Sequence, residues 1–241
     1  MLAKKTKSNE QKLQLLITKY GFKNHTIIWE DGDPVDTILK ICKENIVDLL
    51  VAGGLEKENI FQYYLGSISR EICRKAKCSV LMFREPSIKK TQFKKIVVST
   101  IDHPKTSHTI GAAVYFANHQ KAEELFLLKE VELPGFAMSV ADKSTVPEAD
   151  KIKHDLLEEE NKKIDEILHT IDKGDLKIHR RNLVGKPGYT ISQYSKKLNA
   201  DLLVINSPDT HLTILHRIIT HDIEYVLSNL PRNVLIIHAR V

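Results

Sequence analysis

The chain has 241 residues, of which 42% are apolar, and it carries an excess of five positive charges at pH 7. This length is enough to bury a substantial core, and the composition is that of a globular protein rather than a disordered or fibrous one. No run approaches about 18 consecutive apolar residues, and the basic start "MLAKKTKSNEQK" has no apolar segment after it, so the sequence predicts neither a membrane span nor a secretory signal.

The positive excess lies entirely in residues 1–93. The basic groups there are short and lack interleaved aromatic residues, which favours solvated faces and a linker over a nucleic-acid surface. A patch that attracts an acidic protein partner is the alternative. Three cysteines without CxxC spacing (Cys42, Cys73 and Cys78) predict reduced thiols and therefore a cytoplasmic protein.

Helical and strand patterns alternate along the first third of the chain. Leu13, Leu16 and Ile17 have the spacing of an amphipathic helix. Asp33 is a candidate N-cap, and Pro34 then takes the first helical position. The predicted elements are helices over 9–20, 32–46 and 67–76 and strands over 25–29, 48–53 and 79–83. The continuous apolar strand over 48–53 is typical of a parallel sheet covered on both faces.

The following segment begins with a strand over 94–100, a helix over 106–120 and a strand over 123–131. A polar loop of about 20 residues comes next. After that loop the pattern of the first third returns, which points to an internal repeat.

The repeat is visible in "TILKICKENIVDLLVAG" (37–53) and "TISQYSKKLNADLLVIN" (190–206), which lie 153 residues apart. The same offset pairs Gly21 with Gly174 and Pro34 with Pro187. Further on, "SVLMF" (79–83) corresponds to "NVLII" (233–237). We therefore predict a partial domain over 1–88, a linker over 89–93 and a complete domain over 94–241.

The first copy has no counterpart of the strand, helix and strand over 94–131. By the repeat offset, its first strand would begin about 58 residues before Met1. Two explanations stay open. Either the chain is a fragment or has a misassigned start, or the missing half-unit is supplied to the sheet in some other way.

These residues resemble the universal stress protein family, with two domains in tandem. The segments "GDPVDTILKICKENIVDLLVAGG" and "LGSISREICRKAKCSVLMF" carry the resemblance closely, and residues 94–241 carry it more loosely. It implies an α/β fold of the adenine nucleotide α-hydrolase-like type, with a five-stranded parallel sheet flanked by helices in each complete domain. It also implies that the last strands of two domains pair, within the tandem chain or between two subunits.

Nucleotide-binding members of the family have the pattern Gly-x2-Gly-x9-Gly-(Ser/Thr), in which glycines and a helix N-terminus approach the phosphates. Here the second glycine position holds Glu56, whose carboxylate would repel phosphate. The residues that the resemblance implies for the phosphates of ATP or AMP are Gly53, Gly54, Gly66, Ser67 and Ser69. The structural alternative is a strand-to-loop turn at Gly53-Gly54 and a helix cap at Gly66-Ser67. The segment between these two glycine groups could be a helix.

The opposite wall of such a site is an aspartate at the end of the first strand, which only the second copy has. Asp102 is the candidate, although Ile101 fits the simplest strand register equally well. The glycine pattern of this copy is lost, because Asn206, Asp209 and His221 take its positions. Neither copy is therefore predicted to hold a complete site, and nucleotide binding should be weak or absent.

No catalytic residue and no metal site are predicted. His211, His216 and His221 recur every five residues, but five residues turn a helix by about 500°, so the side chains diverge. No Gly-x-Ser-x-Gly, Walker lysine or catalytic cysteine motif is present.

The favoured hypothesis is a non-catalytic stress-response or signalling module that self-associates through its last strands. One alternative is the cytoplasmic regulatory tail of a cation/proton antiporter. The other is a weak ATP-binding or hydrolysing enzyme that depends on Ser67 or Asp102.

Overall fold

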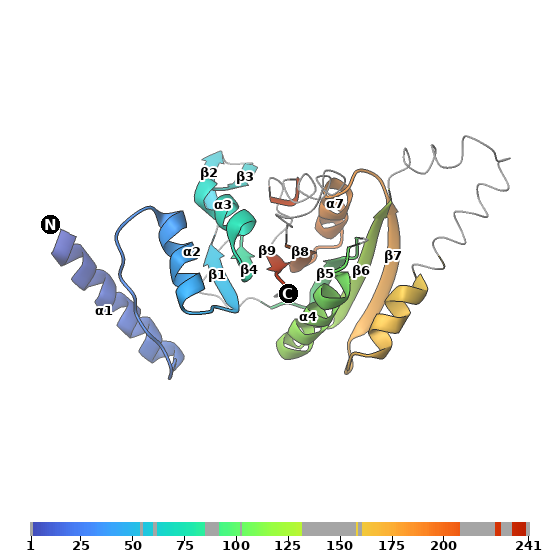
Figure 1. Ribbon diagram of the computed structural model, residues 1–241, viewed down its shortest axis with the longest axis horizontal. Coiled ribbons are helices and arrows are strands. Elements are labelled where there is room, and N and C mark those ends of the chain that lie inside the picture. Colours follow the sequence, from blue (N-terminus) through green and yellow to red (C-terminus); the bar gives the residue numbers. More distant parts are fainter. Residues whose placement is uncertain are drawn as a thin grey trace. The chain divides into compact units, whose positions relative to one another are not determined.

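The computed structural model describes residues 2–53, 55–59, 62–84, 92–101, 103–131, 158, 161–207, 225–227 and 233–239 (Figure 1). The chain divides into two compact units, Met1–Asp33 and Pro34–Val241. Of the helices within the described residues, none combines the length and the apolar character needed to cross a bilayer.

The first unit contains helix α1 (Leu2–Tyr20), which ends at a glycine in the left-handed conformation. Gly21 has φ +68°, and its N–H donates to the carbonyl of Thr18 at 3.3 Å. A side chain would strain this backbone, so glycine is favoured here. Gly174, its counterpart in the repeat, also has a positive φ of +51°. The two glycines therefore correspond for a conformational reason.

The strand predicted over 25–29 is wrong, because these residues form no regular structure. Ile28 and Trp29 are about half exposed, at 48% and 47%. The equivalent strand of the second copy, β7 (Lys177–Val184), pairs in parallel with β6 (Glu124–Val131) along its whole length. No described strand of the first copy corresponds to β6, and a strand forms only where a neighbour accepts its backbone hydrogen bonds.

The second unit is built on one seven-stranded sheet with the order β1-β4-β9-β8-β5-β6-β7 (Figure 1). The five strands not yet bounded are β1 (Leu49–Gly53), β4 (Ser79–Phe83), β5 (Lys95–Ser99), β8 (Leu202–Asn206) and β9 (Asn233–Ile237). The predicted five-stranded parallel sheet is present as β9-β8-β5-β6-β7. The first copy extends it to seven strands by adding β4 and β1.

The two copies join where their last strands meet. β4 and β9 pair antiparallel, with Leu81 opposite Leu235 and Met82 opposite Val234. All four side chains are buried. One sheet therefore takes strands from both sides of the predicted linker. The linker itself stays a prediction, because residues 85–91 lie outside the described part of the chain.

Helices cover both faces of this sheet (Figure 1). On one face lie α2 (Pro34–Glu44), α3 (Ser67–Lys75) and α7 (Tyr189–Lys197), and on the other lie α4 (Thr106–Gln120) and a helix over 161–169. The first core includes Ile72, Met82, Ile191, Leu203 and Ile236, and the second includes Ile110, Val114, Leu125, Leu202 and Leu235. α2 begins at Pro34 and α4 spans 106–120, as predicted.

The three cysteines are free thiols, and Cys73 lies in the first core with 2% of its surface exposed. Burial raises the pKa of the Cys73 thiol from 9.0 to about 12. The folded state therefore favours the neutral thiol. The contribution of this thiol to the free energy of unfolding is fully present below pH 9.0 and is lost progressively toward about pH 12.

We therefore expect the wild-type chain to lose more stability than Cys73→Ala between about pH 8 and about pH 10.5, as measured by urea unfolding. Cys42→Ala serves as the control for the removal of a thiol, because the Cys42 side chain is only partly buried. Parallel pH profiles of wild type and Cys73→Ala would contradict this expectation.

Candidate ligand-binding site

The sheet reverses its strand order between β5 and β8. From β5 the chain passes through α4 to β6 on one side, whereas β8 leads to β9 on the other side. In open α/β sheets, ligands bind at the carboxyl ends of the strands at such a switch point. Three polar residues from separate segments lie there: Thr100 directly after β5, Thr106 at the start of α4, and Asn206 at the end of β8.

Hydrogen bonds tie two of these residues together. The Thr106 hydroxyl donates to the carbonyl of Ile101 at 2.6 Å, and the Asn206 amide Nδ2 donates to the Thr106 Oγ1 at 3.2 Å. Asn206 is only 3% exposed. A buried side chain therefore stands where the predicted pattern has its first glycine, and it fastens β8 to the N-terminus of α4.

Two buried polar atoms at this point have no hydrogen-bond partner among the described residues: Oγ1 of Thr100 and Oδ1 of Asn206. Leaving such an atom unsatisfied costs about 1–3 kcal/mol, so these two atoms are the groups at this point that are suited to bind a further polar group. Asp102 lies outside the described residues. The choice between Asp102 and Ile101 as the wall of the site therefore stays a prediction.

A second polar group follows the ends of β8 and β9. The His238 ring Nδ1 lies 3.1 Å from the Ser207 hydroxyl, and the His238 backbone N–H donates to the Ser79 hydroxyl at 3.2 Å. Ser207 is 3% exposed. Sequence reasoning missed Thr100, Thr106, Ser207 and His238. Their positions could have been found from one sequence signal, a polar residue directly after an apolar strand or at the start of the next helix.

The glycines of the first copy lie on the predicted elements. Gly53 is the last residue of β1, and Gly66 is the N-cap of α3, followed by the exposed Ser67 and the half-buried Ser69. Gly66 has φ −57° and ψ 157°, a conformation open to any residue. Gly54 lies outside the described residues. The backbone at Gly66 therefore does not require glycine.

The segment between these glycines is a β-hairpin and not the candidate helix. β2 (Leu55–Asn59) pairs antiparallel with β3 (Gln62–Leu65), and Glu56 lies opposite Tyr64. The run "FQYYL" is rich in aromatic residues, which favour strands over helices. The hairpin ladder engages backbone groups of this segment with one another.

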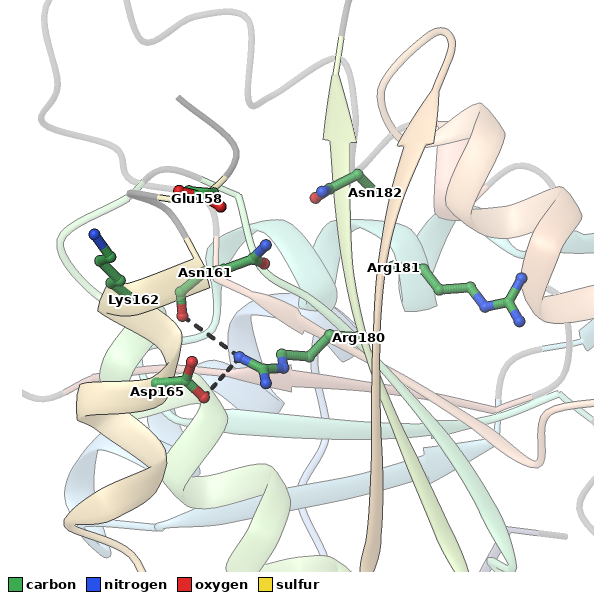
Figure 2. Close-up of a pocket in the computed structure, with 7 residues that line it drawn as sticks. All are labelled: Glu158, Asn161, Lys162, Asp165, Arg180, Arg181 and Asn182. Atoms are coloured by element: carbon green, nitrogen blue, oxygen red, sulfur yellow. Dashed lines mark hydrogen bonds and ion pairs between the residues drawn. The ribbon is translucent and has the colours of Figure 1, made fainter. Parts of the chain in front are cut away.

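A separate hollow of about 490 Å³ lies between β7 and the helix over 161–169 (Figure 2). Its lining is Glu158, Asn161, Lys162, Asp165, Arg180, Arg181 and Asn182. Figure 2 shows Arg180 pointing to Asp165, whose carboxylate it contacts at 2.6 Å, while Arg181 points away. This pair is exposed and worth less than about 1 kcal/mol. Charges of both signs line the hollow, so it has no evident preference for an anion.

Within the described part of the chain, no three His, Cys, Asp or Glu side chains come together as a metal site. His211, His216 and His221 fall outside that part, as does Asp209. The prediction about this histidine series is therefore untested.

Comparison with known proteins matches the sequence model of the universal stress protein family to residues 2–84 and 92–238. A universal stress protein of Methanocaldococcus jannaschii is 29% identical over 76 residues, which are 32% of this chain and 44% of that protein. A universal stress protein of Methanothermobacter thermautotrophicus is 33% identical over 57 residues, or 24% and 38%. The chain thus aligns with less than half the length of either curated relative.

The crystal structure of a universal stress protein from Archaeoglobus fulgidus is similar to this fold with a TM-score of 0.63. The match covers 98% of this chain and 76% of the other at 16% sequence identity. The likeness at this identity concerns the fold.

Proposed function

Because the chain belongs to the universal stress protein family, we propose that it is a non-catalytic stress-response and signalling module with degraded adenine-nucleotide sites. The observation that carries this proposal is the β2–β3 hairpin, which lies between Gly53 and Gly66 in the position of the phosphate loop.

In the first copy, the hairpin works against phosphate binding. A phosphate loop needs backbone N–H groups that point to the ligand. Here the pairing of β2 with β3 engages backbone N–H and C=O groups of the segment in hydrogen bonds with each other. Glu56 adds a negative charge at the position of the second glycine. Repulsion between a carboxylate and a phosphate group further weakens binding.

In the second copy, Asn206 supports the same proposal. Its Nδ2 is engaged with Thr106, so the atom left without a described partner is the carbonyl Oδ1. A carbonyl oxygen and an ionised phosphate oxygen are both acceptors and cannot hydrogen-bond to each other. The Thr100 hydroxyl can donate, but one hydroxyl does not replace a loop of backbone amides.

Calorimetric titration with ATP and with AMP tests this proposal. We expect no saturable binding to the wild-type chain below about 1 mM, a limit of about 4 kcal/mol in binding free energy. Glu56→Gly should bind ATP at least about fivefold more tightly, because it removes the charge and weakens the hairpin. Glu58→Gly is the matched control, since it makes the same charge change in the same strand outside the glycine pattern.

Micromolar binding of ATP by the wild-type chain would overturn the proposal. Equal gains for Glu56→Gly and Glu58→Gly would show that overall charge, and not the glycine position, limits binding. Magnesium-dependent ATP turnover that Ser67→Ala abolishes would favour the enzyme hypothesis instead.

A further inference from the structure

A hollow of about 390 Å³ lies near the C-terminal ends of helices α2 and α3, apart from the switch point of the sheet. Apolar and thiol side chains from α2, the turn after it and the residue before β4 contribute to its lining: Leu39, Cys42, Ile46, Val47 and Cys78. Small-molecule sites have volumes of about 300–1,000 Å³ and mostly apolar linings. The hollow therefore has the size and the lining to hold an apolar chain.

The polar part of this lining is positively charged. Among the described residues it consists of four lysines and no acidic residue: Lys40, Lys43, Lys75 and Lys77. Glu44 lies 4.0 Å from Lys40, and Glu71 accepts a hydrogen bond from Lys75, but four lysines outnumber these two carboxylates. The hollow beside β7 is different, because charges of both signs line it. A surplus of positive charge attracts an anionic group.

Ile46 has an unusual backbone and an exposed side chain at this hollow. Its φ is +49°, a conformation that branched side chains rarely adopt, and 72% of its surface is exposed. The Ile46 N–H donates to the carbonyl of Lys43 at 3.3 Å, and the Val47 N–H donates to that of Cys42 at 3.0 Å. This turn closes the end of α2 and normally has glycine or asparagine at its left-handed position.

The second copy of the repeat has the same turn with a suitable residue. Asn199 corresponds to Ile46, has φ +52°, and donates its N–H to the carbonyl of Lys196 at 3.0 Å. Lys196 in turn corresponds to Lys43. The turn therefore does not require isoleucine, and strained residues of this kind occur at ligand sites.

The same exchange of polar for less polar residues recurs at two other positions of the lining. Leu39 and Cys42 correspond to Ser192 and Ser195 in α7. Both serines are buried, and the Ser195 hydroxyl donates to the carbonyl of Ile191 at 2.7 Å. The apolar side chains of this hollow are therefore a property of the first copy, whereas the lysine at the end of the helix is common to both.

We infer that the hollow binds the free anion of a fatty acid. Its apolar chain contacts Ile46 and the rest of the apolar lining, and its carboxylate lies among the lysines, with Lys43 as a principal partner. A membrane surface fits less well, because a hollow encloses a single chain and a flat bilayer does not enter it. This site is independent of the nucleotide positions and goes beyond the function proposed above.

Calorimetric titration of the full chain with sodium decanoate tests the inference. We expect saturable binding with one-to-one stoichiometry. Butyrate has the same carboxylate on a short chain, so it should bind at least about tenfold more weakly. Decylammonium has the same chain with a positive head group, and it should also bind at least about tenfold more weakly.

Ile46→Asn introduces the residue of the second copy and separates binding from folding. It should weaken decanoate binding at least about fivefold, because apolar contact is lost. It should also raise the urea midpoint of unfolding, because asparagine tolerates the left-handed backbone better than isoleucine does. Ile68→Asn is the matched control, since Ile68 is a 45% exposed isoleucine outside the lining, and it should bind as the wild type does.

Lys43→Glu tests the head group and should weaken decanoate binding at least about fivefold. Lys197→Glu is its control, because Lys197 is an exposed lysine at the end of α7 and the change in net charge is the same. This control should leave the affinity unchanged.

Absence of saturable decanoate binding to the wild-type chain would overturn the inference. Equal affinity of wild type and Ile46→Asn would also overturn it, as would equal or tighter binding of decylammonium. Sedimentation of the wild-type chain with phosphatidylglycerol vesicles, lost in Lys43→Glu and without binding of free decanoate, would identify a membrane surface as the partner instead.

Discussion

Leu202→Ala is expected to lower the free energy of unfolding by about 3 kcal/mol, the central value for a buried leucine. Leu202 lies on β8 in the middle of the sheet, and none of its surface is exposed. Its side chain belongs to the core between the sheet and α4. Truncation removes apolar contacts and leaves a cavity that the surrounding strands cannot close.

The repeat supplies a matched control for this substitution. Leu49→Ala makes the same chemical change at the equivalent position of β1, but Leu49 is 41% exposed. We expect it to cost less than about 1 kcal/mol. Urea unfolding of both variants measures the two values. Equal losses would mean that Leu49 is covered in solution, in conflict with its partial exposure in this structure.

Asp201→Ala is expected to lower the free energy of unfolding by about 2 kcal/mol, because a charge-assisted pair of hydrogen bonds is lost. The carboxylate accepts from the backbone of Lys94 and Lys95, and the Asp201 backbone N–H donates to the Lys95 carbonyl at 2.8 Å. Removal of the side chain leaves the amides of Lys94 and Lys95 without this acceptor.

Thermal or urea unfolding of Asp201→Ala measures the loss, and Asp175→Ala is its control. Asp175 is an exposed aspartate in the turn before β7, so its replacement should change stability by less than about 0.5 kcal/mol. If both variants lost the same stability, net charge rather than the hydrogen bonds of Asp201 would be the cause.

Elements with a strong local pattern were predictable from the sequence. The helix over 106–120 and the strand over 79–83 have the predicted bounds, and Pro34 begins a helix. In these segments the spacing of the apolar residues, or the fixed φ of proline, indicates helix or strand without information about distant parts of the chain. The repeat also made the α/β fold and the tandem arrangement predictable.

Features that depend on distant partners were not predictable from local pattern. Residues 25–29 have strand-forming residues but no described partner strand, so they form no strand. The opposite holds for β2 and β3. These residues have a weak helical pattern, but they form strands because β2 and β3 pair with each other. At the site, Asn206 was recognised only as a missing glycine. Its bond to Thr106 spans 100 residues of sequence and exists only because the topology places β5 beside β8.

The antiparallel joint between β4 and β9 has a consequence for the order of folding. Val80 pairs with Ile236, so β4 can pair with β9 only after about 150 further residues have been synthesised. At about 5–20 residues per second, this delay is on the order of ten seconds. During that time the nascent first copy holds an apolar strand without the β9 partner that it has in the folded chain, and an unpaired apolar edge favours pairing with other chains.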